Sequence, residues 1–587
     1  MTAPLVVANC SGFYGDRLSA MREVLDGGPV DVVTGDWLAE LTLLLLGRQQ
    51  LKDPTAGWAR TLLTQLEDCL GTLLERGTKV VANAGGLNPS GLSDAVAELA
   101  RRLGLQVRVA TVSGDGLLPR LPALDVRLGE QPPGGAPVSG ALTANAYLGC
   151  WGVVEALRGG ADLVVTGRIT DASLVVGPAA WHHGWTRSDL QQLAGATVAG
   201  HVLECGTQAT GGNYSFFHEL PAGAYDAVGF PLAEIADDGS FVVTKHPGTG
   251  GTVTVETVTE QLLYECTGAA YGGPDVVTRF DTLDLAQVGP DRVRVTGAVG
   301  SPPSGWLKVA TNTLGGWRNT VTLPLTGLQV QAKAALLQRQ LAPVLAGIAE
   351  VEVVLVRTDT PDAATQEQAS ALLRVSVKDP DRDKVGKSFT APLVELGLSS
   401  IPGFHAEAAP SAPSAYGVYS PAWVSARDVP SVVTLPDGSL IEIPSYDEKA
   451  CGTAGLVISQ TAEPEPEPEP TGPTRRVALG TVVGARSGDK GGAVTLGAYA
   501  RSDDAWRWLA AFLTVERLQA LLPEARGLPV TRELLPGLRA VLFQVPGLLG
   551  QGVAAGTRFD PQGKAVGEWL RSRVVEVPTR LLEESSP

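Results

Sequence analysis

The loop SGFYGDR at residues 11–17 combines two glycines with charged side chains, and this pattern could bind an anion. Glycine lets the backbone turn tightly, and the N–H groups at the start of a following helix attract negative charge. We expect Gly12, Gly15 and Arg17 to form this anion site. The glycine spacing lacks the full G-x-G-x-x-G pattern of dinucleotide-binding loops, so a plain strand-to-helix turn is the alternative interpretation.

A second loop, NAGGLNP at residues 83–89, places two glycines between two asparagines. Asn83 and Asn88 can each donate and accept hydrogen bonds, while Gly85 and Gly86 allow the backbone to take positive φ. We predict that these four residues bind polar atoms of a ligand, with a bare turn as the alternative.

A third loop, TGRITDAS at residues 166–173, puts an arginine directly after an apolar run. A guanidinium at the edge of a core needs a carboxylate or phosphate partner, because an unpaired charge there is costly. We predict that Arg168 binds the anionic group of a substrate, with Asp171 beside it. Two alternatives stay open: Asp171 is itself the partner of Arg168, or it caps the helix that begins next.

The segment HVLECG at residues 201–206 could supply a proton carrier and a thiol. In a helix, His201 and Cys205 share one face at positions i and i+4, and Glu204 lies beside them. We predict that His201 carries the proton, that Glu204 orients it and that Cys205 is a possible nucleophile. The alternative is a buried thiol and a histidine satisfied by a carbonyl. A fourth metal ligand is missing from the pattern, so we predict no metal site.

These loops need rigid elements to bring them together, and the sequence supplies an alternation of short apolar runs and helical patterns. Apolar runs alternating with helices indicate βαβ units and a parallel sheet, which places the loops after its strands on one edge. The predicted strands are at 5–8, 30–36, 79–82, 106–111 and 161–165.

The composition and the pattern of apolar residues change along the chain, and these changes predict four parts. We expect a parallel-sheet α/β part at 1–205 and a mixed α+β lobe at 206–455. The Glu-Pro alternation within 456–475 cannot sustain a helix or a strand ladder and predicts a spacer, followed by a small α/β domain at 476–587.

Composition excludes several classes of function. The 587 residues carry 46 basic and 62 acidic side chains, a net charge of −16 that disfavours binding to nucleic acid or to an anionic membrane. Six cysteines without a CxxC pair, together with the absence of a signal peptide or membrane-spanning run, predict a cytoplasmic protein. No metal or redox cofactor is signalled, and the sequence leaves the oligomeric state open, a homo-oligomer included.

Several of these strings, taken in order, resemble the acyclic terpene utilisation AtuA family. The matching segments lie at 11–17, 35–40, 83–89, 166–173, 201–206, 229–231, 260–265 and 486–491. The last segment departs from the family at Gly492, where we expect asparagine more often. The resemblance implies an AtuA domain followed by a ferredoxin-like AtuA C-terminal domain. It also implies a link to catabolism of citronellol- or geraniol-type terpenoids, whose acids are processed as coenzyme A thioesters.

We therefore expect an enzyme whose partner is a small-molecule acid or acyl-CoA, with a CoA thioester as a possible substrate. The sequence assigns no reaction class. The alternative is a non-catalytic scaffold or subunit that organises partner enzymes through its two domains.

Overall fold

The structure is a computed structural model that describes residues 3–445 and 472–584. It divides into two compact units. The larger comprises Met1–Asn312, Tyr419–Val553 and Gln562–Pro587, and the smaller comprises Thr313–Val418 and Ala554–Pro561. The Glu-Pro segment predicted as a spacer at 456–475 lies, up to residue 471, outside the described residues.

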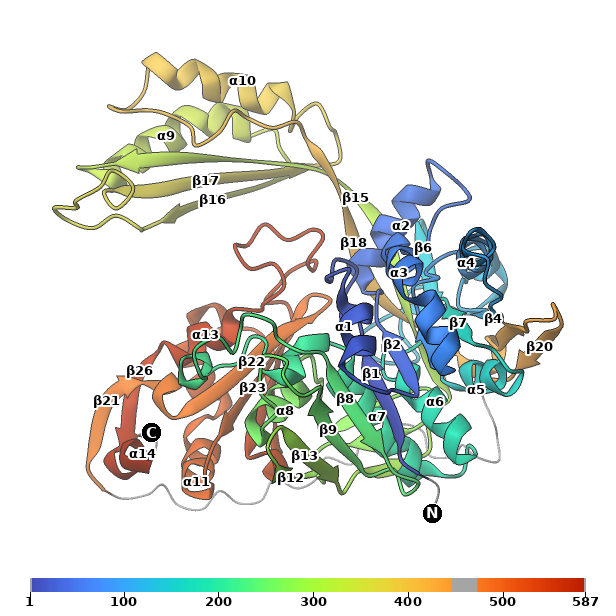
Figure 1. Cartoon of the computed structure of the whole chain (residues 1–587). Helices are drawn as coiled ribbons and strands as arrows, with labels where there is room; N and C mark the ends of the chain where they lie inside the picture. The colour runs from blue at the N-terminus through green and yellow to red at the C-terminus, as the bar shows by residue number, and fades with distance from the viewer. Residues whose placement is uncertain (1–2, 446–471, 585–587) are drawn as a thin grey trace. The chain divides into compact units, whose positions relative to one another are not determined.

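The larger unit is built on an eleven-stranded sheet in the order β12-β13-β9-β8-β1-β2-β3-β7-β4-β19-β20 (Figure 1). Its five central strands are parallel, as predicted: β1 (Leu5–Asn9), β2 (Val32–Gly35), β3 (Lys79–Ala82), β7 (Leu163–Thr166) and β4 (Val109–Ser113). Strand β4 begins later than the predicted 106–111, because the N–H of Arg108 donates to Asp162 Oδ2 at 3.1 Å instead of joining the ladder.

Helices cover both faces of the central strands because successive side chains point to opposite faces. Val32 and Val33, for example, belong to different hydrophobic clusters. One face packs against α1 (Ala20–Gly27), α3 (Arg60–Arg76) and α4 (Pro89–Leu103). The other packs against α5 (Trp151–Arg158), α6 (Ser173–His183) and α7 (Leu190–Leu203). This three-layer arrangement leaves the carboxyl ends of the parallel strands uncovered for the loops that come after them.

The sheet continues past residue 205. Strands β8 (Pro231–Ile235), β9 (Phe241–Lys245), β12 (Asp284–Gly289) and β13 (Arg292–Thr296) extend one edge antiparallel, and β19 (Ser431–Thr434) with β20 (Leu440–Ile443) extends the other. Helix α8 (Val255–Leu263) is followed by a small sheet of β10 (Ala270–Gly272), β11 (Val277–Arg279) and β14 (Val299–Ser301), which packs against helix α7. The lobe predicted at 206–455 is thus shared between the two compact units.

The C-terminal domain is a four-stranded antiparallel sheet within the larger unit. Its order is β22 (Val483–Lys490), β23 (Ala493–Ala500), β25 (Ala540–Val545) and β24 (Thr531–Leu535). Helices α11 (Asp503–Phe512), α12 (Val515–Leu521) and α13 (Val566–Arg571) cover one face. Strand β21 (Thr474–Ala478) pairs with β26 (Val574–Pro578), and α14 (Thr579–Glu584) comes next in the chain. The other face of the four-stranded sheet packs against the N-terminal domain.

The smaller unit is a sheet covered on one face by two helices (Figure 1). Strands β15 (Trp306–Thr326) and β18 (Ser414–Ser425) each contribute residues to both units, while β16 (Glu350–Val356) and β17 (Ser370–Asp379) lie in the smaller one. Helices α9 (Val330–Leu345) and α10 (Lys387–Glu395) bury the apolar face. Two further short strands, β5 (Arg127–Leu128) and β6 (Thr143–Ala146), pair with β18 and β15, and α2 (Glu40–Gln50) comes after β2. Across the described residues, no helix is both long enough and apolar enough to span a bilayer.

A buried carboxyl fastens the C-terminal domain to the N-terminal one. Glu260, on α8, accepts hydrogen bonds from the Ser215 N–H at 3.0 Å and from the Tyr499 hydroxyl at 3.0 Å. Ser215 in turn bonds through its hydroxyl to the backbone of Ala485 at 3.1 Å. Burial raises the pKa of Glu260 to about 7. Its protonation is therefore linked to the docking of the two domains.

This linkage predicts how stability depends on pH. The pKa of Glu260 is raised from 4.5 to about 7 on folding, so its contribution is fully present below pH 4.5 and is lost as pH rises through 7. The shift corresponds to about 3 kcal/mol. Glu260→Gln removes this titration. Between pH 4.5 and 8, we expect the free energy of unfolding measured in urea to fall by about 3 kcal/mol less in Glu260→Gln than in the wild type. Glu75→Gln, at an exposed glutamate, is the control. Parallel pH profiles for wild type and Glu260→Gln would contradict this assignment.

Candidate active site

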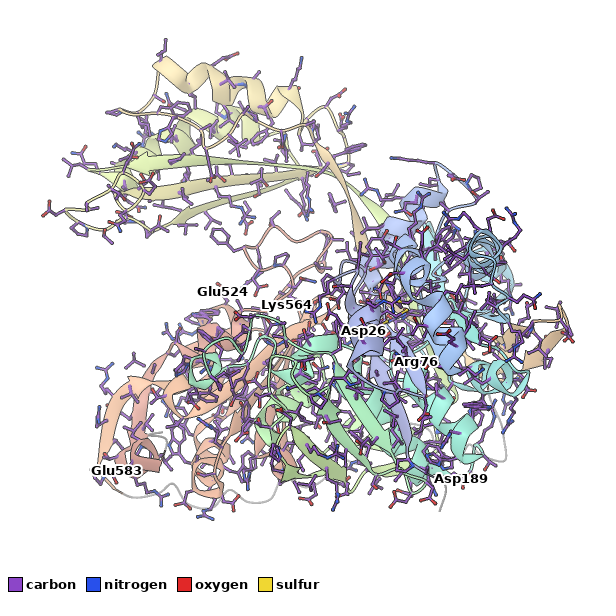
Figure 2. All side chains as sticks on the ribbon, in the orientation of Figure 1. Asp26, Arg76, Asp189, Glu524, Lys564 and Glu583 are labelled. Atoms are coloured by element: carbon purple, nitrogen blue, oxygen red, sulfur yellow. The ribbon has the colours of Figure 1, made fainter. Side chains whose placement is uncertain are left out.

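A cavity of about 1500 Å³ opens in the larger unit at the carboxyl ends of the parallel strands. Its lining comes from the loops after β1, β2, β5 and β7, the segment after α7, residues 264–281, the strands β15 and β18, and the C-terminal domain. Figure 2 shows the side chains on the ribbon and labels Lys564, one of the lining residues from the C-terminal domain. The volume of the cavity exceeds the 300–1,000 Å³ typical of small-molecule pockets, so the cavity has room for an extended ligand.

The loop after β2 supplies two carboxyl groups. Asp36 lies directly after the strand, where its Oδ1 accepts the Leu38 N–H at 3.0 Å and an Asn83 amide N–H at 2.5 Å. Burial and the charge of Asp171 hold the pKa of Asp36 well above its usual value. Glu40 begins helix α2, and its Oε1 accepts the Tyr147 hydroxyl at 3.0 Å. Burial would raise the pKa of Glu40, but the ammonium groups of Lys308 and Lys490 lower it to about 2.

The loop after β7 holds a buried arginine. Arg168 donates from Nη1 to Asp171 Oδ1 at 2.7 Å and to the Leu38 carbonyl at 2.9 Å. Its guanidinium carbon lies 4.1 Å from the centre of the Tyr147 ring. Burial raises the pKa of Asp171, Arg168 counteracts that rise, and the result is about 6. Arg168 is therefore paired within the chain, with its side chain only 3% exposed.

The C-terminal domain contributes a lysine and an aspartate at the end of β22. Lys490 Nζ lies 3.0 Å from Glu265 Oε2, and the nearby carboxylates of Glu265 and Glu40 raise the pKa of Lys490 although burial opposes this. Burial and the charge of Glu265 raise the pKa of Asp489 to about 7. The cavity thus holds two carboxyl groups, Asp171 and Asp489, that exchange protons close to neutral pH.

Three cavity-lining side chains carry buried polar atoms that lack a partner. They are Arg168 Nε, Glu204 Oε2 and the Tyr419 hydroxyl, none of which forms a hydrogen bond within the described residues. Buried polar groups in native proteins nearly always find partners. Each of these atoms exposes less than 1 Å² of surface, so the three lie just beneath the cavity wall and not on its surface.

Of the predicted trio, only His201 lies in helix α7; the helix predicted to continue through Cys205 ends at Leu203, and Glu204 and Cys205 follow it. Glu204 and Cys205 line the wall, but the His201 side chain is buried behind it, with Nδ1 2.9 Å from Glu204 Oε1. The His201 ring packs 5.3 Å from that of Tyr271. Burial and the charge of Glu204 raise the pKa of Cys205 well above its usual value. Cys205 therefore stays a protonated thiol at neutral pH, a state that is poor for nucleophilic attack.

The loop predicted to orient polar ligand atoms shapes the site from behind instead of lining it. Asn83 is fully buried and its Oδ1 accepts the Trp37 N–H at 2.7 Å, which fixes the chain after β2. Asn88 caps helix α4 by accepting the Gly91 N–H at 2.9 Å. A Cβ on Gly85 would come within 2.5 Å of the Thr166 carbonyl, and Gly86 has a φ of +54°.

The loop predicted to bind an anion is satisfied by its own side chain. Asp16 accepts the N–H groups of Gly12 at 2.9 Å and of Arg17 at 2.8 Å. Arg17 pairs with Glu23 at 2.7 Å, and neither Arg17 nor Gly15 lines the cavity. Gly12 does line it, and its lack of a side chain has a clear reason. A Cβ there would lie 2.6 Å from the Cys205 carbonyl carbon, so only glycine allows this close approach.

Sequence reasoning left out the residues that dominate the site: Glu40, Lys308, Tyr419, Asp489 and Lys490. A partial signal exists at RSGDKG, residues 486–491, where three charges crowd a short segment with two glycines. The sequence alone favours a solvated turn there, but the structure places Arg486–Lys490 in strand β22. Lys308 and Tyr419 lie inside the strands β15 and β18, where no local pattern marks them.

The site offers acid–base groups. Within residues 3–445 and 472–584, no group of three or more His, Cys, Asp or Glu side chains could hold a metal ion. Carboxylates, the lysines Lys308, Lys490 and Lys564, and tyrosines line the cavity, and such groups can bind a carbonyl oxygen and transfer protons next to it.

A three-layer α/β domain and a small antiparallel domain that share one cavity define the class of this protein. A family model described as acyclic terpene utilisation family protein AtuA matches residues 5–435. A second, described as the AtuA ferredoxin-like domain, matches residues 477–576. The chain therefore belongs to the AtuA family, and its C-terminal domain is ferredoxin-like. No curated protein and no solved structure matches it.

The charge cluster around Lys490 predicts the effect of removing its ammonium group. In Lys490→Met, Glu265, Glu40 and Asp489 lose a shared counter-charge, so we expect a loss of about 2 kcal/mol in the free energy of unfolding at pH 8. The loss should shrink at pH 5, because protonation relieves the repulsion between carboxylates. Urea unfolding at the two pH values measures it, with the exposed Lys52→Met as control. An equal loss at both pH values would exclude this charge coupling.

Proposed function

We propose that this chain is an enzyme of acyclic terpenoid catabolism that binds a small amphiphilic acid or its thioester and moves a proton next to the carbonyl group. The charged side chains of Glu40, Asp489 and Lys490 carry the proposal, because they line one cavity and can bind a carbonyl oxygen and accept a proton next to it. Arg168 is paired with Asp171 and supports this end of the cavity from within.

The cavity also offers an apolar wall for a hydrocarbon chain. Trp306, Leu307 and Trp423 line it from strands β15 and β18, and Tyr264 and Tyr271 line it from the region after α8. Large aromatic side chains bury apolar ligand surface efficiently. A molecule with a polar head and a branched hydrocarbon tail matches this division.

The polar end has the groups that proton transfer needs. The ammonium of Lys490 would hydrogen-bond the carbonyl oxygen and stabilise the negative charge that develops there. Asp489, with a pKa of about 7, would accept the proton from the neighbouring carbon, since a base with a pKa near the working pH is effective. Glu204 and His201 form a second acid–base pair in and behind the wall.

Deuterium uptake tests the proposal directly. The wild-type protein is incubated in D₂O with octanoyl-CoA or with citronellic acid, and mass spectrometry monitors incorporation next to the carbonyl. We expect uptake that rises as Asp489 ionises through about pH 7. Asp489→Asn should slow it at least about 100-fold, the size of effect that general bases have.

Matched variants separate binding from chemistry. Asp94→Asn, at an exposed position of α4, should leave uptake unchanged. Lys490→Met should weaken binding of both ligands in calorimetry, because both carry a carbonyl oxygen for its ammonium group. Binding without any deuterium uptake would refute proton transfer, and failure of both ligands to bind would refute the substrate class.

A further inference from the structure

One face of the ferredoxin-like sheet changes character along its length. The register across β22, β23, β25 and β24 arranges its residues in rows, because directly paired residues point to the same side. The row of Tyr499, Ala540 and Leu535 belongs to the main hydrophobic core. Two residues further along each strand, Leu542 is still in that core. This part of the face docks the domain.

The next row on the same face is polar and uncharged. Thr495 pairs with Gln544, and Gln544 pairs with Thr531, so three strands each present a hydrogen-bonding side chain in register. All three line the cavity. The row between it and the core holds Leu542 beside Glu533, whose carboxylate accepts the Ala269 N–H at 2.6 Å, whereas the side chains of this row face the cavity.

The polar row has capacity for further hydrogen bonds. The side chains of Gln544 and Thr531 form none within the described residues. Thr495 is 1% exposed, and its hydroxyl makes only a long contact of 3.4 Å with the Gly488 carbonyl. A glutamine amide and threonine hydroxyls each donate and accept, which suits a ligand segment whose neutral groups do both.

The register of the sheet fixes the distance between this polar row and Lys490 at the charged end of the cavity. Lys490 pairs with Ala493 in the adjacent row, on the same face. With strands about 4.8 Å apart and about 3.4 Å per residue along a strand, the path from Lys490 to Thr531 is about 16 Å. Only an extended chain touches both ends of such a path.

We infer that the row of Thr495, Gln544 and Thr531 is a subsite for the neutral, amide-bearing pantetheine arm of an acyl thioester. The thioester carbonyl would lie at Lys490, and the arm would run along the polar row of the ferredoxin-like sheet. This inference rests on the proposed function and makes it more specific: the substrate is the thioester and not the free acid. It also gives the C-terminal domain a direct part in substrate recognition.

Binding measurements with two ligands test the subsite. Octanoyl-CoA and octanoate are titrated by calorimetry into the full-length wild type, Gln544→Leu and Thr531→Val. We expect the wild type to bind octanoyl-CoA more tightly than octanoate. Gln544→Leu should weaken octanoyl-CoA about tenfold and Thr531→Val severalfold, the effect of losing one or two hydrogen bonds. Neither change should alter the affinity for octanoate, which also shows that the variants are folded.

Further arms identify the contact and separate the two proposals. Free pantetheine should displace octanoyl-CoA from the wild type and do so about tenfold less well from Gln544→Leu. Gln338→Leu, at an exposed position of α9, should bind as the wild type does. The subsite would be overturned if Gln544→Leu lowered the affinities for octanoyl-CoA and octanoate equally, or lowered neither. It would also be overturned if the wild type bound octanoate but not octanoyl-CoA. Unchanged binding of both ligands by Lys490→Met would instead overturn the proposed function.

Discussion

The ion pair between the partly buried Lys490 and Glu265 is the interaction on which the site depends. Charged groups leave water only when opposite charges and hydrogen bonds compensate them. Lys490 comes from the ferredoxin-like domain, whereas Glu265 and Glu40, which raise its pKa, come from the N-terminal domain. Glu40 also has Lys308 of its own domain nearby, but Lys490 and Glu265 meet at 3.0 Å only when the domains dock, so docking completes the cavity.

The architecture around this cluster obeys local rules that can be read in the sequence. Apolar runs ending in glycine loops predicted the parallel strands, and alternate side chains such as Val32 and Val33 feed the two helical layers. The rule that ligands bind at the carboxyl ends of parallel strands placed the loops of Gly12 and Arg168 at the cavity, whereas the loop of Asn83, selected by the same rule, lies behind the wall. Periodicity and turn chemistry are therefore enough to predict these strands and the edge of the sheet where the loops gather.

The finer geometry depends on tertiary contacts that leave no local pattern. Glycines at Gly85 and Gly12 resemble a ligand cradle, yet each is required by close contact with a neighbouring backbone. Lys308 and Tyr419 reach the site from β15 and β18, which belong to a different sheet from the parallel strands. No motif in the surrounding sequence marks either residue as part of a site. The same holds for Lys490, whose turn looks solvated until a second domain buries it. Such residues are set by register and docking, which single-sequence periodicity does not encode.

A rigid strand connects docking to chemistry within the C-terminal domain. Glu260 holds Tyr499 at one end of β23, and Ala493 at the other end pairs with Lys490. Because the hydrogen-bonded ladder between β22 and β23 is continuous over eight residue pairs, a shift at Tyr499 is transmitted to Lys490 instead of being absorbed locally. The carboxyl that fastens the domains therefore also sets the position of the ammonium group. Since burial raises the pKa of Glu260 to about 7, close to that of Asp489, both the docking contact and the proposed base change charge over one pH range.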